Sequence, residues 1–174
     1  ILDDGYGISV PREMQTTKGS ISDALAGMQK SKDSNGYEIF VTKGWDYTHL
    51  CETYEKAVKV AREQHIPVLI HVKEVNQPQG HSTSGSHERY KDEERLKWEV
   101  EFDCITKFRE WILSFDAKGL KLSSEAELKE IEDSAKKIVR EEKSAAWKAY
   151  TDDIKTDLSA ATAMINAVAD QSEN

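Results

Sequence analysis

The sequence predicts an α/β fold, in which a small parallel sheet is followed by helices. Residues 37–42 are rich in β-branched and aromatic side chains, as expected of a strand. An amphipathic stretch with apolar residues three and four apart comes next, and residues 66–73 then form a nearly continuous apolar run. Strand, helix and strand in this order form a βαβ unit, which implies a parallel strand pair with a right-handed crossover.

Local signals place the other elements of this region. Residues 1–10 predict a short strand and a turn, and residues 21–28 predict one or two helical turns with Ser20 or Ser22 as the cap. Asp46 is expected to cap the helix of the βαβ unit, because its carboxylate can accept hydrogen bonds from free N–H groups of the first turn. That helix should end near Gln64-His65, before Pro67. Its apolar face consists of Leu50, Tyr54, Ala57, Val58 and Ala61.

Helices are predicted for most of the remaining chain. Residues 92–115 form one predicted helix, and a break follows at 117–122. Ser123 or Ser124 then caps another helix, and Glu127 completes a capping-box pattern with Ser124. This helix is expected to reach about Tyr150, and an Ala-rich helix follows over 154–168. The apolar stripe of the 92–115 helix is predicted to be Leu96, Val100, Cys104, Phe108, Trp111 and Ile112.

The number of strands determines what kind of domain this is. Three short parallel strands need helices on both faces to exclude water, so residues 1–115 are predicted to be the carboxyl half of a doubly wound parallel-sheet domain. Residues 116–174 are predicted to be a helical extension. Ligands in such sheets bind beyond the carboxyl ends of the strands. The loops at 3–11 and 77–91 both follow predicted strands, so both are expected to face one crevice.

Composition excludes some classes of function. The 174 residues carry a net charge of -8, which gives no overall basic surface for nucleic acid. No apolar run reaches transmembrane length, and no signal peptide is visible, so no membrane partner is expected. Cys51 and Cys104 lie far apart in helical patterns and are predicted to be buried thiols in a reducing compartment, which favours a cytoplasmic location.

Each loop allows a chemical role and a plainer alternative. The carboxylate of Asp4 and the backbone carbonyl of Tyr6 offer hard oxygen ligands for Mg²⁺, and the alternative is an acidic turn with Gly5 at positive φ. In the second loop, His81 is suited to binding phosphate or transferring a proton, and Arg89 to pairing with an anion. The alternatives there are a solvated loop, or a metal pair formed by His81 and His87.

Four segments, in the same order, resemble the alpha subunit of the thiamine diphosphate-dependent 2-oxoacid dehydrogenases. Residues 3–9 are similar to the family's Asn-Asn-X-Tyr-(Ala/Gly)-(Ile/Met)-Ser, and residues 44–46 to its Gly-X-Asp. Residues 67–72 resemble its Pro-X-Leu-Ile-Glu strand, and residues 80–84 its His-Ser-X-Ser phosphorylation loop. The resemblance covers residues 1 to about 115.

This resemblance implies thiamine diphosphate and Mg²⁺ as cofactors. In the family, the second Asn of the first motif and the Tyr carbonyl bind the metal, and these positions match Asp4 and Tyr6. Ser9 ends the motif and is expected to contact the cofactor. The loop histidine, which matches His81, lies close to the cofactor and is implicated in reductive acylation of the lipoyl group. Ser82 matches the serine that is phosphorylated in mitochondrial members, where the added charge disorders the loop.

The chain departs from the family pattern in several places. Asp4 replaces an Asn, Gln77 replaces an Arg that contacts phosphate, and Gly85 replaces the Asp after the phosphorylation motif. These departures suggest a divergent branch, for example one in which alpha and beta regions are fused in one chain.

The function implied by the resemblance is part of an oxidoreductase, a 2-oxoacid dehydrogenase of the branched-chain (2-oxoisovalerate) or pyruvate type. It decarboxylates a 2-oxo acid on thiamine diphosphate and passes the acyl group to a lipoyl arm. The expected partners are a beta subunit or beta region and a lipoyl-bearing transacylase, in an oligomeric multienzyme complex. The chain starts within the first motif, without the upstream Gly-Asp-Gly, and we expect this fragment to be inactive alone. A helical interaction module, with 123–168 packing on a partner, and a catalytically degenerate relative remain alternatives.

Overall fold

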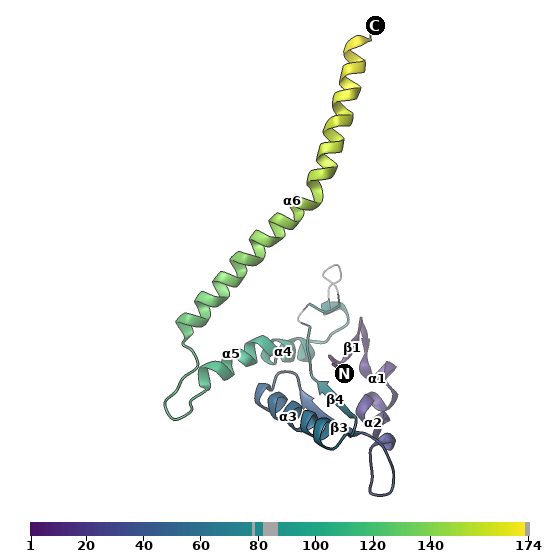
Figure 1. Cartoon of the computed structure of the whole chain (residues 1–174), viewed down its shortest axis with the longest axis vertical. Coiled ribbons are helices and arrows are strands. Elements are labelled where there is room, and N and C mark those ends of the chain that lie inside the picture. Colours follow the sequence, from purple (N-terminus) through teal and green to yellow (C-terminus); the bar gives the residue numbers. More distant parts are fainter. Residues whose placement is uncertain (78, 82–86, 173–174) are drawn as a thin grey trace. The chain divides into compact units, whose positions relative to one another are not determined.

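The computed structural model describes residues 1–77, 79–81 and 87–172 and contains two compact units. Unit 1 spans Ile1–Leu122 and holds the strands and most of the helices, whereas unit 2 begins at Ser123 and consists of one long helix (Figure 1). The predicted combination of a parallel strand pair with a helical tail is therefore confirmed. The doubly wound arrangement of a larger sheet stays a prediction.

The βαβ unit is present as predicted. Strands β3 (Glu38–Lys43) and β4 (Val68–Lys73) run parallel, with Glu38 opposite Val68 and Lys43 opposite Lys73. Helix α3 (Tyr47–Glu63) connects them and packs against both strands (Figure 1).

Both ends of α3 form where the local signals predict them. The Asp46 carboxylate accepts the His49 N–H at 3.0 Å, so this side chain caps the first turn. Past the other end, His65 adopts a left-handed backbone (φ 55°), which stops the helix before Pro67.

The first three residues extend the sheet on the other side of β4. Leu2 forms a parallel bridge with Val72, and the Asp3 N–H donates to the Val72 carbonyl at 2.9 Å. The chain then turns into the two-residue antiparallel strands β1 (Tyr6–Gly7) and β2 (Val10–Pro11). This third parallel segment matches the strand and turn predicted for residues 1–10.

Short helical segments connect β2 to β3. Helix α1 (Arg12–Gln15) and the 3-10 helix η1 (Thr17–Gly19) come first, and α2 (Ile21–Ala24) and the 3-10 helix η2 (Ala26–Met28) follow. Ser20 caps α2 by accepting the Asp23 N–H at 3.4 Å, so of the two serines considered, Ser20 is the cap.

The prediction of one helix over residues 92–115 is wrong. After the 3-10 helix η3 (His87–Arg89), the chain forms two helices, α4 (Glu93–Glu101) and α5 (Cys104–Ser114). The break arises because the Asp103 carboxylate accepts the Thr106 N–H at 2.8 Å and thereby caps a new helix.

The predicted apolar stripe of this region is also wrong in part. Val100 is 76% exposed, whereas the neighbouring Glu99 is only 3% exposed, so α4 turns a charged side chain inward. The prediction of buried thiols likewise fails for Cys51, which is exposed, and Cys104 is half-buried; both are free.

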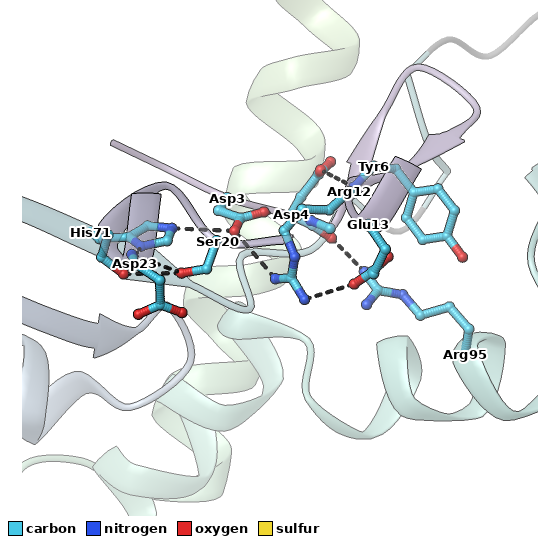
Figure 2. Close-up of polar contacts among 11 residues, drawn as sticks. Asp3, Asp4, Tyr6, Arg12, Glu13, Ser20, Asp23, His71 and Arg95 are labelled. Carbon is cyan, nitrogen blue, oxygen red and sulfur yellow. Dashed lines mark hydrogen bonds and ion pairs between the residues drawn. The ribbon is translucent and has the colours of Figure 1, made fainter. Parts of the chain in front are cut away.

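Asp3 ties the N-terminal segment to the sheet through its side chain as well as its backbone. One carboxylate oxygen accepts the Gly5 N–H at 3.0 Å, and the other lies 3.2 Å both from Arg12 Nη1 and from His71 Nε2 (Figure 2). His71 is fully buried, and its Nδ1 lies 2.9 Å from the Ser22 hydroxyl. The cluster therefore joins β4, α2 and the turn after Asp3.

The protonation of this cluster follows from its burial and its partners. Burial lowers the pKa of His71, and the opposing effect of Asp3 is weaker, so the imidazole is neutral near pH 7. Burial raises the pKa of Asp3, but the Gly5 N–H and the Arg12 guanidinium outweigh it, and the pKa of Asp3 is lowered overall. A neutral His71 that donates from Nε2 to Asp3 accepts from Ser22 at Nδ1.

Unit 2 is a single helix, α6 (Glu125–Gln171). The predicted capping box is confirmed, because Ser124 Oγ accepts the Glu127 N–H at 3.3 Å and the Glu127 carboxylate accepts the Ser124 N–H at 2.8 Å. The predicted interruption near residues 151–153 is wrong: no Pro or Gly occurs there, and ion pairs four residues apart, such as Lys148–Asp152, bridge it. Among the described residues, no helix has the length and apolar character needed to cross a membrane.

The His71 cluster predicts how stability changes with pH. Because the pKa of His71 is lowered by folding, the unfolded chain binds this proton more readily, and the free energy of unfolding should fall once the pH drops below about 6.5. The variant His71→Gln should flatten the profile between about pH 7 and 5. Urea unfolding at several pH values measures this, and His65→Asn, at an exposed histidine, is the control that should keep the wild-type slope.

The capping box predicts opposite effects for two Ser→Ala substitutions in α6. Ser124→Ala removes the cap and should destabilise the first turn by about 1 kcal/mol. Ser134→Ala lies inside the same helix and should increase helicity slightly, because Ala has the highest helix propensity. Amide exchange at Leu128, whose N–H donates to the Ser124 carbonyl, reports on the first turn. Equal effects of the two substitutions would contradict the capping role.

Candidate functional site

The turn from Asp4 to Tyr6 is the centre of the candidate site. The Asp4 carboxylate accepts the Tyr6 N–H at 2.8 Å, and the Gly5 carbonyl accepts the Arg12 N–H at 2.8 Å (Figure 2). Gly5 has a φ of 88°, which agrees with the acidic turn given as the alternative to a metal site, and a side chain there would be strained. The turn is thus held by its own carboxylate and by the start of α1.

This turn forms part of the wall of an open pocket of about 740 Å³. The pocket lies between the N-terminal segment, the end of β4 and the start of α4. Five of its lining residues are acidic and three are basic. The charged lining residues are Asp4, Glu13, Glu74, Asp92 and Glu94 on the acidic side, and Arg12, Lys73 and Arg95 on the basic side.

Arg95 connects α4 to the turn. Its Nη2 donates to the Asp4 carbonyl at 2.6 Å, and its guanidinium lies 5.2 Å from the centre of the Tyr6 ring (Figure 2). Its Nε donates to Glu99 Oε1 at 2.8 Å. One planar guanidinium therefore fixes a backbone carbonyl and an aromatic ring while it pairs with a carboxylate.

Glu99 is the buried partner of two cations. Lys91 Nζ lies 2.7 Å from Oε1 and 2.8 Å from Oε2, and both side chains are at least 96% buried. Because Arg95 also pairs with Oε1, the Glu99 charge is compensated from two sides. The Glu99 backbone carbonyl accepts a hydrogen bond from Asn76 Nδ2 at 3.1 Å.

The Tyr6 ring packs among charged and aromatic groups. Lys91 Nζ lies 5.5 Å from its centre, and the Tyr90 ring lies 5.8 Å away in a tilted arrangement. Burial raises the pKa of the Tyr6 phenol, which therefore stays protonated at neutral pH. Tyr6, whose carbonyl is an expected metal ligand, is thus packed against the end of the 77–91 loop.

The structure brings some of the predicted site residues together and leaves others apart. Asp4 and Tyr6 lie on the pocket wall, whereas Ser9, in the turn between β1 and β2, and His81 are exposed and do not line it. Arg89 is also exposed. Ser82 lies outside the described residues. Beside the loop histidine, Gly80 has a φ of 70°, and a Cβ at this position would clash with the Tyr90 hydroxyl.

The oxygen donors at the turn fit a hard divalent cation. In the described ranges, no group of three or more His, Cys, Asp or Glu side chains is placed to hold a metal. The His81–His87 pair stays a prediction. One carboxylate and one backbone carbonyl are, however, the kind of ligands that Mg²⁺ takes when phosphate oxygens and water complete its shell. Because acidic side chains outnumber basic ones in the pocket, a diphosphate bound to a cation is also favoured over a diphosphate without a cation.

Sequence reasoning missed the charged residues that support the turn. Lys91, Arg95 and Glu99 are spaced four residues apart, a spacing that in a helix normally indicates exposed ion pairs. Arg12 and His71 were likewise not identified as partners of Asp3. The spacing of Lys91, Arg95 and Glu99 was visible in the sequence, but the burial that makes these residues important was not.

The comparisons with known proteins agree with the resemblance seen in the motifs. A family model described as dehydrogenase E1 component matches residues 1–155. The chain is 32% identical over 117 residues to the pyruvate dehydrogenase E1 component subunit alpha of Rickettsia bellii, an alignment that covers 67% of this chain and 34% of the relative. The subunit of the same name from Rickettsia felis is 31% identical over 117 residues, with 67% and 34% covered.

The matches cover different shares of this chain and of its relatives. The chain spans about a third of the length of the curated relatives it matches. No solved structure matches it significantly. The family model, however, matches most of the chain and begins at its first residue. The chain therefore belongs to the dehydrogenase E1 component family, and within it is similar to alpha subunits of 2-oxoacid dehydrogenases.

Proposed function

We propose that this chain forms the alpha-type part of a thiamine diphosphate-dependent 2-oxoacid dehydrogenase component. The observation that supports the proposal is the fixed turn at Asp4–Tyr6, whose residues line an open pocket and include the carboxylate and the carbonyl expected at the metal. The turn follows a parallel segment of the sheet, where ligands of doubly wound domains bind. A doubly wound arrangement in the complete protein is part of this proposal.

The residues of the turn would hold Mg²⁺, and the metal would hold the diphosphate. Asp4 and the Tyr6 carbonyl provide one face of the metal shell. When bound, thiamine diphosphate supplies a carbanion at its thiazolium ring and stores the electrons released by decarboxylation. The chain itself holds the turn that carries these oxygen ligands in place. The Arg95 side chain binds the Asp4 carbonyl, and the Arg12 backbone N–H binds the Gly5 carbonyl.

The other predicted site residues are assigned by the family motif. Ser9 would contact the cofactor, and His81 would transfer a proton during acyl transfer to the lipoyl group, because an imidazole can both donate and accept a proton. Ser82 would be a site at which a phosphoryl group blocks the loop. The names of the curated relatives favour pyruvate over a branched 2-oxo acid as the substrate.

The partners follow from the same proposal. A beta subunit or beta region would complete the cofactor site, and a lipoyl-bearing transacylase would accept the acyl group in an oligomeric multienzyme complex. A cytoplasmic location and the absence of nucleic-acid and membrane partners remain predictions.

A second candidate, a helical interaction module, is favoured by one observation on unit 2. Helix α6 carries large apolar side chains that are more than half exposed, including Ile131, Ile138, Trp147, Leu158 and Ile165. Light scattering separates the two proposals, because an interaction module would associate without any cofactor.

Substitution of Asp4 tests the proposed metal site. In the chain assembled with its beta partner, Asp4→Ala should weaken Mg²⁺-dependent retention of thiamine diphosphate by at least about tenfold, equivalent to about 1.4 kcal/mol. Asp4→Asn should stay close to wild type, because the amide oxygen can replace the carboxylate at the metal. Asp33→Ala, at an exposed loop residue far from the pocket lining, is the matched control. Unchanged retention in Asp4→Ala would contradict the proposal.

The chain studied by itself should bind the cofactor only weakly. The pocket has more acidic than basic side chains, and Gln77 stands where the family has a phosphate-binding Arg, so few cations are available for the diphosphate. Calorimetric titration of the 174-residue chain with thiamine diphosphate and Mg²⁺ is the measurement. Tight binding would show that the chain needs no beta partner to complete the site.

A further inference from the structure

We propose that Glu99 is a positioning residue that couples the Asp4–Tyr6 turn to both ends of the segment between Asn76 and Lys91. The metal-binding consequence of this coupling rests on the proposed function, whereas the coupling itself does not. The contacts that support it all involve described residues, and Glu99, Lys91, Arg95 and Asn76 lie outside the four segments that resemble the family.

Glu99 binds the residue that begins this segment and the residue that ends it. Asn76 Nδ2 donates to the Glu99 carbonyl at 3.1 Å and to the Phe102 carbonyl at 2.9 Å, so it satisfies carbonyls at the end of α4. Lys91 Nζ donates to the Glu99 carboxylate at 2.8 Å. Asn76 is 9% exposed and Lys91 is 7% exposed, so neither readily exchanges its partner for water. Glu99 therefore contacts both ends, Asn76 through its backbone carbonyl and Lys91 through its carboxylate.

The same carboxylate orients the group that holds the turn. Arg95 Nε donates to Glu99 Oε1 at 2.8 Å, and this contact directs Arg95 Nη2 to the Asp4 carbonyl at 2.6 Å. The Asp92 carboxylate caps α4 through the Arg95 N–H at 2.7 Å, so the backbone under Arg95 is fixed as well. Movement of the Glu99 carboxylate would thus release Arg95 and Lys91 together.

Tyr6 provides a second contact between the same two regions. Its ring lies 5.2 Å from the Arg95 guanidinium carbon and 5.5 Å from Lys91 Nζ. Both cations that pair with Glu99 therefore also lie against the residue that carries the proposed metal-binding carbonyl. Outer groups that orient metal ligands commonly change metal affinity by about 10- to 100-fold when they are removed.

Amide exchange in the ligand-free chain tests the coupling. We expect Glu99→Gln to speed exchange by at least about tenfold at two places at once, the Gly5 and Tyr6 amides in the turn and the Tyr90 and Lys91 amides, because both cations lose a charged partner. Glu101→Gln is the matched control, since Glu101 lies on the same helix and is exposed. Faster exchange only at Tyr90 and Lys91 would overturn the proposal.

Two further variants separate positioning from general loss of stability. Arg95→Gln removes the contact with the turn but leaves Lys91 paired with Glu99, so exchange should accelerate at Gly5 and Tyr6 and not at Lys91. Ala57→Gly perturbs the buried face of α3 and should accelerate exchange throughout unit 1. If Glu99→Gln gives the uniform pattern of Ala57→Gly, its role is structural and the proposal is wrong.

The ligand-bound experiment distinguishes this inference from the proposed function. In the chain assembled with its beta partner, Glu99→Gln should weaken Mg²⁺ binding in the presence of thiamine diphosphate by about 10- to 100-fold. Unaltered Mg²⁺ binding in Glu99→Gln would overturn the inference, provided that the wild type binds. If the wild type binds neither metal nor cofactor, the proposed function fails, and the exchange experiment alone decides whether the turn and the segment ends are coupled.

Discussion

The part of unit 1 that forms the candidate site depends on cations that compensate the negative charge of buried carboxylates. Glu99 pairs with Lys91 and Arg95, and Asp3 lies against Arg12 and His71. Removing one partner of a buried ion pair typically costs about 3–5 kcal/mol, because the remaining charge stays out of water. Few apolar side chains are buried, namely Ala57, Ile66 and Val72 among the described residues, so these polar contacts are what join the N-terminal segment and α4 to the sheet.

The departure of Asp3 from the family motif has a physical explanation in these contacts. Where the family has an amide, this chain has a carboxylate that faces an arginine and accepts from a neutral histidine. An amide oxygen would be a weaker partner for the Arg12 guanidinium, because charge-assisted hydrogen bonds are about twice as strong as neutral ones. The first acidic residue of the motif is therefore structural, which leaves Asp4 to face the pocket.

The turn that carries the proposed metal ligands is fixed from two directions. Arg12 donates its backbone N–H to Gly5 from one side, and Arg95 binds the Asp4 carbonyl from the other. Oxygen ligands held in this way need little rearrangement when a cation binds, which lowers the entropic cost of cation binding. His81, in contrast, is exposed and does not line the pocket. Contacts within unit 1 therefore fix the Asp4–Tyr6 turn more firmly than they fix the loop histidine.

The sequence by itself determined the elements whose signals are local. The βαβ unit, the caps at Asp46 and Ser124 and the left-handed turn at Gly5 each depend on residues within a few positions of one another. Only the tertiary structure decided which face of α4 is buried, that Glu99 pairs with two cations, and that Asp3 lies against Arg12 and a neutral His71. The contacts of Asp3 with His71 and of Asp4 with Arg95 join residues 68 and 91 positions apart, which no local pattern predicts. The partners of Glu99 are near in sequence, but a helical spacing pattern does not show whether an ion pair lies in water or away from it.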